Sequence, residues 1–181
     1  MACSGCFRAV RHACYLHGYR YIQFLPFRKI RSIYDIDLVP NFKDLTFHLY
    51  LTGGYGEAFS DFLRGLDQRF VFLDIGANQG LYSIIAAQNP KCERVYAFEP
   101  VEKTFNLLNE NCVLNNVQER VEPIRKAIGK ASGTAEIQVM EYHSGASYMS
   151  ESSSRKAQRM EIIGTVNHAA LDTMIACPLG A

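Results

Sequence analysis

Apolar positions in the middle of the chain predict alternating strands and helices. Residues 70–73 form a continuous apolar run ending at Asp74, which is typical of a strand buried on both faces of a parallel sheet. A glycine-rich turn and a helix over 81–88 follow, and further strands are expected over 94–98 and 121–127, with a helix between them. This order predicts an α/β fold with a Rossmann-like, doubly wound parallel sheet.

The pattern upstream of residue 53 is different. Residues 7–24 place apolar side chains three or four apart, which predicts a helix. Two alternating runs, 34–38 and 45–51, flank a turn signal and predict a β-hairpin. We therefore expect an N-terminal helix and hairpin extension over 1–52 and an α/β domain over 53–181.

Beyond the third strand the chain has weaker patterns. Residues 135–139 alternate as a strand, and 160–166 are compatible with another. The segment 144–159 is rich in serine with little apolar periodicity, so we expect a loop.

The charge is close to balanced overall, but it is uneven along the chain. The net charge of +1 gives no general attraction to nucleic acid, whereas residues 1–43 carry seven basic and two acidic side chains with eight aromatics among them. Such a segment can bind phosphates and stack bases, or lie on an anionic membrane. Since no nucleic-acid module pattern appears, we favour an amphipathic cap on the main domain and expect no nucleic-acid partner.

The cysteine spacing and the hydropathy bear on whether the protein binds a metal and whether it crosses a membrane. Cys3 and Cys6 have metal-ligand spacing, and His12, Cys14 and His17 could complete a zinc site, but a second close cysteine pair is missing. Free thiols are the simpler interpretation, so we expect no metal.

No stretch approaches the roughly 20 apolar residues of a membrane span, and basic residues interrupt the N-terminal apolar positions, so we expect no transmembrane segment and a cytoplasmic protein.

The candidate cofactor site lies where the first two strands of the sheet end. Gly76, Asn78 and Gly80 belong to the turn after Asp74, and the helix that follows directs its N–H groups and positive dipole end to the same place. The dinucleotide fingerprint G-x-G-x-x-G is absent, which disfavours a nicotinamide oxidoreductase. An acid two residues before the first glycine can instead accept from the ammonium group of S-adenosylmethionine.

The other cofactor contacts are expected at the ends of the neighbouring strands. Glu99 ends the second strand, where a carboxylate can accept from both ribose hydroxyls, although it could also simply stabilise the start of the next helix. Ala127 ends the third strand, at the place where an adenine could lie.

Several segments resemble the FkbM family of methyltransferases. They are "FLDIGANQGLYS", "VYAFEP", "LLNENCVLNN", "KAIGKASGTAEI" and "LDTMI", and they appear in the family's order over residues 70–175. "GGYGEAF" resembles an upstream segment in which a glutamate lies near the cofactor, here Glu57. The resemblance implies S-adenosylmethionine as the cofactor and O-methylation of a sugar, lipid or polyketide-like acceptor.

One departure from that family concerns the end of the chain. The family's next strand, with a Lys-Ile-Asp-x-Glu-Gly pattern, is absent after "LDTMI", so we expect a C-terminally truncated domain with an unpaired sheet edge, through which copies could associate. A non-catalytic cofactor-binding or partner-binding fragment is therefore the alternative function. We assign no catalytic residue, because His48, His143 and His168 are each more typical of ordinary surface or core histidines.

Overall fold

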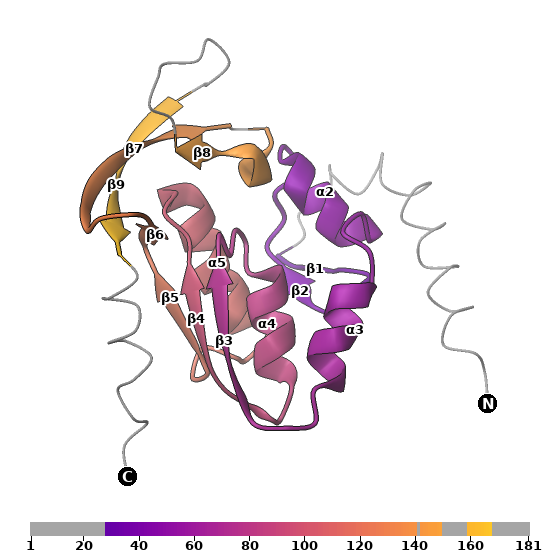
Figure 1. Ribbon diagram of the computed structural model, residues 1–181. Helices are drawn as coiled ribbons and strands as arrows, with labels where there is room; N and C mark the ends of the chain where they lie inside the picture. The colour runs from indigo at the N-terminus through magenta and orange to yellow at the C-terminus, as the bar shows by residue number, and fades with distance from the viewer. Residues whose placement is uncertain (1–27, 141, 150–158, 168–181) are drawn as a thin grey trace, which may run out of the picture.

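The computed structural model describes residues 28–140, 142–149 and 159–167, and the expected helix over 7–24 and the zinc candidates lie outside them. At its centre, β3 (Phe70–Ile75), β4 (Cys92–Phe98) and β5 (Val121–Ile124) form a parallel sheet in the order β3-β4-β5. Helix α4 (Leu81–Gln88) connects the first two strands and α5 (Glu102–Leu114) the next two (Figure 1). The Rossmann-like fold expected from the apolar pattern is confirmed.

A second sheet lies against the end of the first. It contains β6 (Lys126–Ile128), β7 (Gly133–Val139), β8 (Tyr148–Met149) and β9 (Arg159–Val166) in the order β6-β9-β7-β8. The strands expected over 135–139 and 160–166 are confirmed as an antiparallel pair. The single strand expected over 121–127 is wrong, because the chain changes sheets at Arg125, which places Ala127 on β6 rather than β5.

The hairpin expected over 34–51 is also wrong. Short strands β1 (Ile30–Arg31) and β2 (Asp37–Leu38) do pair antiparallel, but Leu45–Thr52 forms helix α2. The side chain of Asp44 caps its first turn by accepting from Thr46 N, and Gly53 ends it in the left-handed conformation with φ +82°. These caps, rather than the alternating apolar pattern, fix the local conformation.

The main core lies on the helical side of the three-stranded sheet. Helix α4 is buried along its whole length, and it packs between the sheet and α3 (Ala58–Gly65) (Figure 1). The serine-rich loop contains the short 3₁₀ turn η1 (Ser144–Ala146), which contacts α2. Core burial therefore joins α2 and β2 to the α/β unit in one hydrophobic cluster.

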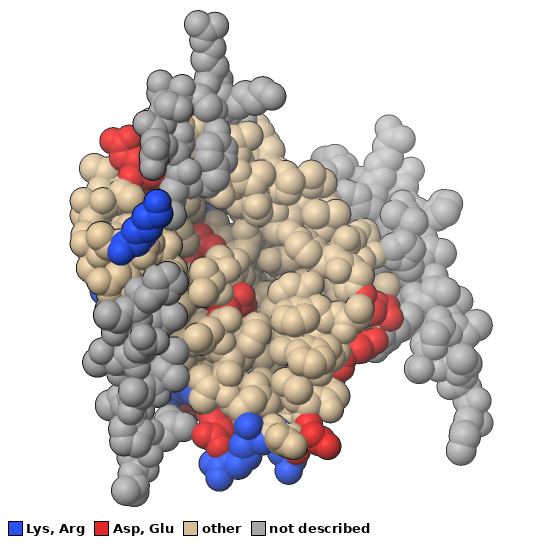
Figure 2. Space-filling view, in the orientation of Figure 1, with Lys and Arg blue, Asp and Glu red and all other residues tan. Residues whose placement is uncertain are grey.

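Strand β3 is at the edge of its sheet within the described residues. Val71 and Ile75 on this strand are 40% and 59% exposed, and Phe59 and Phe62 of α3 are also exposed. In Figure 2 the middle of the face shown is mostly uncharged, with a few acidic atoms visible near its centre, and basic and acidic side chains gather along its lower edge. None of the helices in the described ranges is long and apolar enough to span a membrane.

Candidate functional site

The two predicted acids lie at neighbouring carboxyl ends of the parallel strands. In the register of β3 and β4, Asp74 is opposite Ala97 and Ile75 is opposite Phe98, so Glu99 follows immediately at the same edge. The turn after β3 folds over this edge, because the backbone N–H groups of Gly76 and Ala77 both donate to Phe98 O at 2.9 Å. The predicted juxtaposition of Asp74 and Glu99 is thus present.

Glu99 is a buried carboxyl group held by backbone amides. The residue is 5% exposed. Its Oε2 accepts from Asn78 N and its Oε1 accepts from Val101 N, both at 2.9 Å. Burial raises the pKa of Glu99 to about 7, and the nearby charge of Asp74 acts in the same direction, while the two amide hydrogen bonds oppose the rise. The group can therefore gain or lose a proton near neutral pH.

Asp74 is only partly covered by its neighbours. Its Oδ2 accepts from Ser83 Oγ, in the first turn of α4, at 2.6 Å. Burial raises the pKa of Asp74, and the hydrogen bonds from Ser83 oppose that rise. The carboxylate keeps lone pairs that could accept from a ligand ammonium group.

The turn itself depends on backbone conformations that favour glycine. Gly76 has φ +81° with open space where a Cβ would be, whereas at Gly80, with φ +91°, a Cβ would lie 2.6 Å from Leu108 Cδ1. Asn78 also adopts a positive φ of 51°, which asparagine tolerates better than most residues. Gly76 thus leaves room beside the turn, and Gly80 lets α5 pack closely.

The backbone amides of the turn itself, residues 76–80, are all bonded within the protein. Besides the two that donate to Phe98 O, the amide of Asn78 donates to Glu99, that of Gln79 to Asn78 Oδ1, and that of Gly80 to Ala77 O. The turn folds inward onto the end of β4, and this satisfies its own donors. A ligand here would contact the surface of the turn rather than a cradle of free amides.

A cavity of about 220 Å³ opens beside the turn. Its walls come from the ends of β3 and β4, from β6 and β7, and from the segment after η1: Ile75, Gly76, Phe98, Pro100, Lys126, Ala127, Ile128, Ile137 and Ser147. Most of these side chains are apolar, which suits a planar ring. The structure therefore brings Ala127 and Gly76 to one cavity.

Glu57 lies at the start of helix α3 rather than in the turn or at a strand end. It is the residue before α3, its side chain does not cap that helix, and its main-chain carbonyl accepts from Ser60 Oγ at 2.7 Å. Of the seven predicted residues only Gly76 and Ala127 line the cavity, so Glu57 is outside its lining, as are Asp74, Asn78, Gly80 and Glu99.

Sequence reasoning missed a buried polar cluster behind the turn. Asp44 is 1% exposed and accepts hydrogen bonds from α2, from Gln79 and from Ser144, and Asn111 of α5 donates to Gln79 O. The signal available in the sequence was Asp44 followed by an apolar helix ending at Gly53, which indicates a capped helix.

Comparison with known proteins identifies the family. A model of the TRM5/TYW2 methyltransferase domain matches residues 64–174. The chain belongs to this family. It is thus an S-adenosylmethionine-dependent methyltransferase by family, and the predicted enzyme class and cofactor are confirmed.

Individual relatives match over limited lengths. The methyltransferase sdnD of Sordaria araneosa is 28% identical over 83 residues, which cover 44% of this chain and 32% of that protein. The TYW2 structure from Methanocaldococcus jannaschii with AdoMet is 21% identical, with a TM-score of 0.41 over 52% of this chain and 47% of its own. A complex of aTrm5 with tRNALeu is 23% identical, with a TM-score of 0.35 over 39% of this chain and 20% of its own. The chain therefore spans about a third of the curated relative it matches.

Two expectations are corrected by these comparisons. The resemblance to the FkbM family is wrong, because the matching family is TRM5/TYW2; short glycine-turn and strand-end motifs are shared widely among such folds and did not discriminate. The exclusion of a nucleic-acid partner is also wrong: it relied on the absence of a nucleic-acid module pattern, and the chain belongs to the TRM5/TYW2 family, of which a Trm5 protein has been solved with tRNALeu.

Proposed function

We propose that this chain binds S-adenosylmethionine across the carboxyl ends of β3 and β4 and transfers its methyl group to an RNA acceptor of the tRNA class. The observation that carries the cofactor site is the pair of carboxylates at adjacent strand ends, beside a turn and an apolar cavity.

Each predicted site residue has a proposed role in this arrangement. Asp74 accepts from the ammonium group of the cofactor, and Glu99 accepts from the ribose hydroxyls with lone pairs that its backbone bonds leave available. Ala127 forms part of the adenine cavity. The three turn residues Gly76, Asn78 and Gly80 shape the wall beside the methionine moiety.

The proposal retains a cofactor contact for Glu57, the residue before α3. Its place outside the cavity lining is compatible with a contact to the amino-acid end rather than to the adenine.

Family membership supports the choice of acceptor. The family is named after TRM5 and TYW2, and one similar structure is a complex of a Trm5 protein with tRNALeu. The +5 charge of residues 1–43, with eight aromatic side chains, gives the chain a segment that can bind phosphates and stack bases. Methyl transfer to a base nitrogen, carbon or oxygen would release S-adenosylhomocysteine and one proton, and it depends mainly on holding donor and acceptor in line.

Calorimetry tests the cofactor site. We expect S-adenosylmethionine and S-adenosylhomocysteine to bind, and Asp74→Ala and Glu99→Ala each to weaken binding by about 1.5–3 kcal/mol, the scale of a hydrogen bond to a charged group. Glu110→Ala, which removes an exposed acid on the outer side of α5, is the matched control and should leave affinity unchanged. Unchanged affinity in both site variants would remove these acids from the site.

Transfer of labelled methyl groups tests the acceptor. The protein should label a tRNA pool in preference to a panel of sugar and lipid hydroxyl compounds, and raising the salt concentration should weaken its binding to tRNA. Labelling of a sugar or lipid with none of tRNA would overturn the RNA proposal and leave the cofactor site standing.

A further inference from the structure

Asp44 is the most heavily hydrogen-bonded buried acid behind the cofactor turn. Its Oδ1 accepts from Thr46 N and Ser144 N, both at 3.0 Å, and its Oδ2 accepts from Gln79 Nε2 and Ser144 Oγ, both at 2.6 Å. Asn41 Nδ2 also donates to Oδ2 at 3.3 Å. A helix cap needs only the first of these bonds, so the others call for a further explanation.

Those additional bonds connect Asp44 to the cofactor turn along two routes. Gln79 belongs to the turn and donates to Asp44 directly. Ser144, which donates to Asp44, also has its Oγ 3.1 Å from Asn78 Oδ1, the same oxygen that accepts from Gln79 N. The carboxylate of Asp44 therefore bonds the side chain of Gln79 directly, and Ser144, which it also bonds, lies close to the side chain of Asn78.

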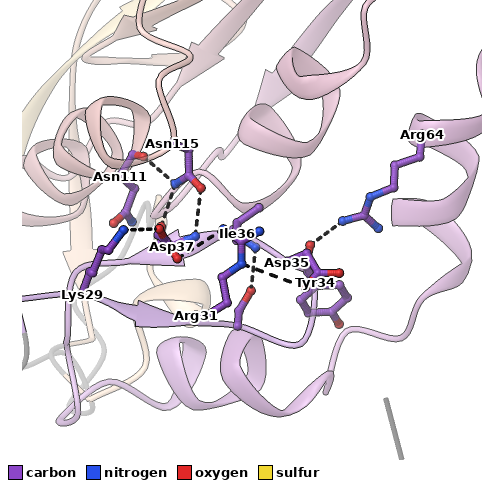
Figure 3. A network of polar contacts seen from close by, with 10 residues as sticks. Lys29, Arg31, Tyr34, Asp35, Ile36, Asp37, Arg64, Asn111 and Asn115 are labelled. Carbon is purple, nitrogen blue, oxygen red and sulfur yellow. Dashed lines mark hydrogen bonds and ion pairs between the residues drawn. The ribbon is translucent and has the colours of Figure 1, made fainter. Parts of the chain in front are cut away.

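Asn111 bonds the main chain of the turn, whereas Asp44 bonds the side chain of Gln79. Its Nδ2 donates to Gln79 O at 2.8 Å, and its Oδ1 accepts from Val39 N, also at 2.8 Å. Figure 3 shows Asn111 beside Asn115, whose side chain accepts from the N–H of Asp37 and donates to its carbonyl. Gln79, which is fully buried, is thus fixed at its side chain by Asp44 and at its carbonyl by Asn111.

We infer that Asp44 and Asn111 are positioning residues that set the conformation of the cofactor turn through Gln79, so that residues 39–44 form part of the cofactor site although they precede the family-matched region. This inference rests on the proposed cofactor site. Gln79 directly follows Asn78, whose backbone N–H donates to Glu99 Oε2. Release of Gln79 should therefore disturb the wall that faces the methionine moiety more than the adenine cavity, whose lining includes Gly76 of the turn but neither Asn78 nor Gln79.

The hydrogen bonding of the Gln79 side chain predicts that Asp44→Asn and Asp44→Ala weaken ligand binding to different extents. Gln79 Oε1 is buried without a hydrogen-bond partner, whereas its Nε2 donates to Asp44. In Asp44→Asn the glutamine amide can turn over, so that Oε1 accepts from the new amide group. In Asp44→Ala neither orientation finds a partner, so the turn loses its side-chain tether.

The experiment compares two ligands that differ at the amino-acid end. S-Adenosylhomocysteine carries that end, and 5′-methylthioadenosine has the adenosine and sulfur without it. Asp44→Ala should weaken binding of S-adenosylhomocysteine about tenfold and that of 5′-methylthioadenosine by less than about twofold. Asp44→Asn should show a smaller loss of the same kind.

The matched control destabilises α2 at its other end. Gly53→Ala places a side chain at φ +82°, with its Cβ 3.3 Å from Ile33 Cγ2, and leaves Asp44 and the turn intact. It should lower the thermal midpoint and leave the affinity ratio of the two ligands at the wild-type value. A double variant of Asp44→Ala with Gln79→Ala should bind no more weakly than the weaker single variant, because both remove the same tether.

The outcomes separate the inference from the proposed function. If wild-type protein binds both ligands but Asp44→Ala loses affinity for both equally, or Gly53→Ala changes the ratio as much, the positioning role is overturned and the cofactor site stands. If wild-type protein binds neither ligand, the proposed cofactor site fails, and the inference fails with it. Selective loss of S-adenosylhomocysteine in Asp44→Ala alone supports the inference.

Discussion

Replacing Glu99 with glutamine should remove a pH dependence of folding stability. The carboxyl group binds its proton more tightly in the folded protein, where burial raises the pKa from 4.5 to about 7, than in the unfolded chain. Its contribution to stability is therefore complete below pH 4.5 and is lost as the pH rises through 7. The difference corresponds to about 3 kcal/mol between pH 4.5 and pH 8.

The variant has an opposing cost. Glutamine has one acceptor oxygen, whereas Glu99 accepts from both Asn78 N and Val101 N, so one buried amide would lose its partner at a cost of about 1–3 kcal/mol. At pH 8 this loss offsets most of the gain from removing the buried charge, and the two proteins should have similar stability. At pH 5 the wild type should be more stable by about 1–3 kcal/mol.

Urea denaturation at half-unit steps from pH 5 to pH 8 measures this difference. Asp74, whose pKa is also raised by burial, contributes a slope of the same sign in both proteins, so the quantity to compare is the wild-type slope minus the variant slope. Equal slopes in the two proteins would refute the assignment of the titration to Glu99.

Three further outcomes follow from the packing. Gly80→Ala should lower the free energy of unfolding, measured by urea denaturation, by about 3 kcal/mol or more, because at φ +91° its Cβ would lie 2.6 Å from a leucine side chain of α5. Gly76→Ala, whose Cβ meets open space, should lower it by only about 1–2 kcal/mol. Equal losses would contradict this packing. Asn115→Ala should cost about 2 kcal/mol, because the N–H and carbonyl of Asp37 both lose their side-chain partner, and a loss below about 0.5 kcal/mol would show that the backbone bonds are dispensable. Burial raises the pKa of Cys112 to about 12, so mass spectrometry should find it unalkylated by iodoacetamide at pH 8 until the protein is unfolded, and rapid labelling of the folded chain would be inconsistent with that burial.

The central sheet and the two site acids were predictable because their signals are local. The run before Asp74 is continuous and apolar, and each acid follows its own strand directly, so parallel topology alone brings Asp74 and Glu99 together. Helix α2 was not predicted, because Leu45–Thr52 alternates apolar and polar residues by chance while its capping residues lie outside the run. The capping signal and the alternating pattern compete, and the caps decide.

The polar cluster behind the turn was beyond sequence reasoning for a different reason. Asp44 contacts Gln79 and Ser144, which are 35 and 100 residues away, and no periodic pattern records such pairings. The family was missed because the strand-end motifs report the fold and the cofactor class, which many families share. Only comparison over residues 64–174 distinguishes TRM5/TYW2 from its relatives.

The long sequence separation of these contacts sets the order in which the chain can fold during synthesis. Residues 37–44 leave the ribosome before their partners do. Those on α5 are 72–78 residues later in the chain, and Ser144 is 100 residues after Asp44. Local helices and the β3–β4 pair can form earlier, since closing a shorter loop costs less entropy. We therefore expect the turn to acquire its final shape after the rest of the parallel sheet, so that a nascent chain ending before residue 144 has the sheet but does not yet bind the cofactor.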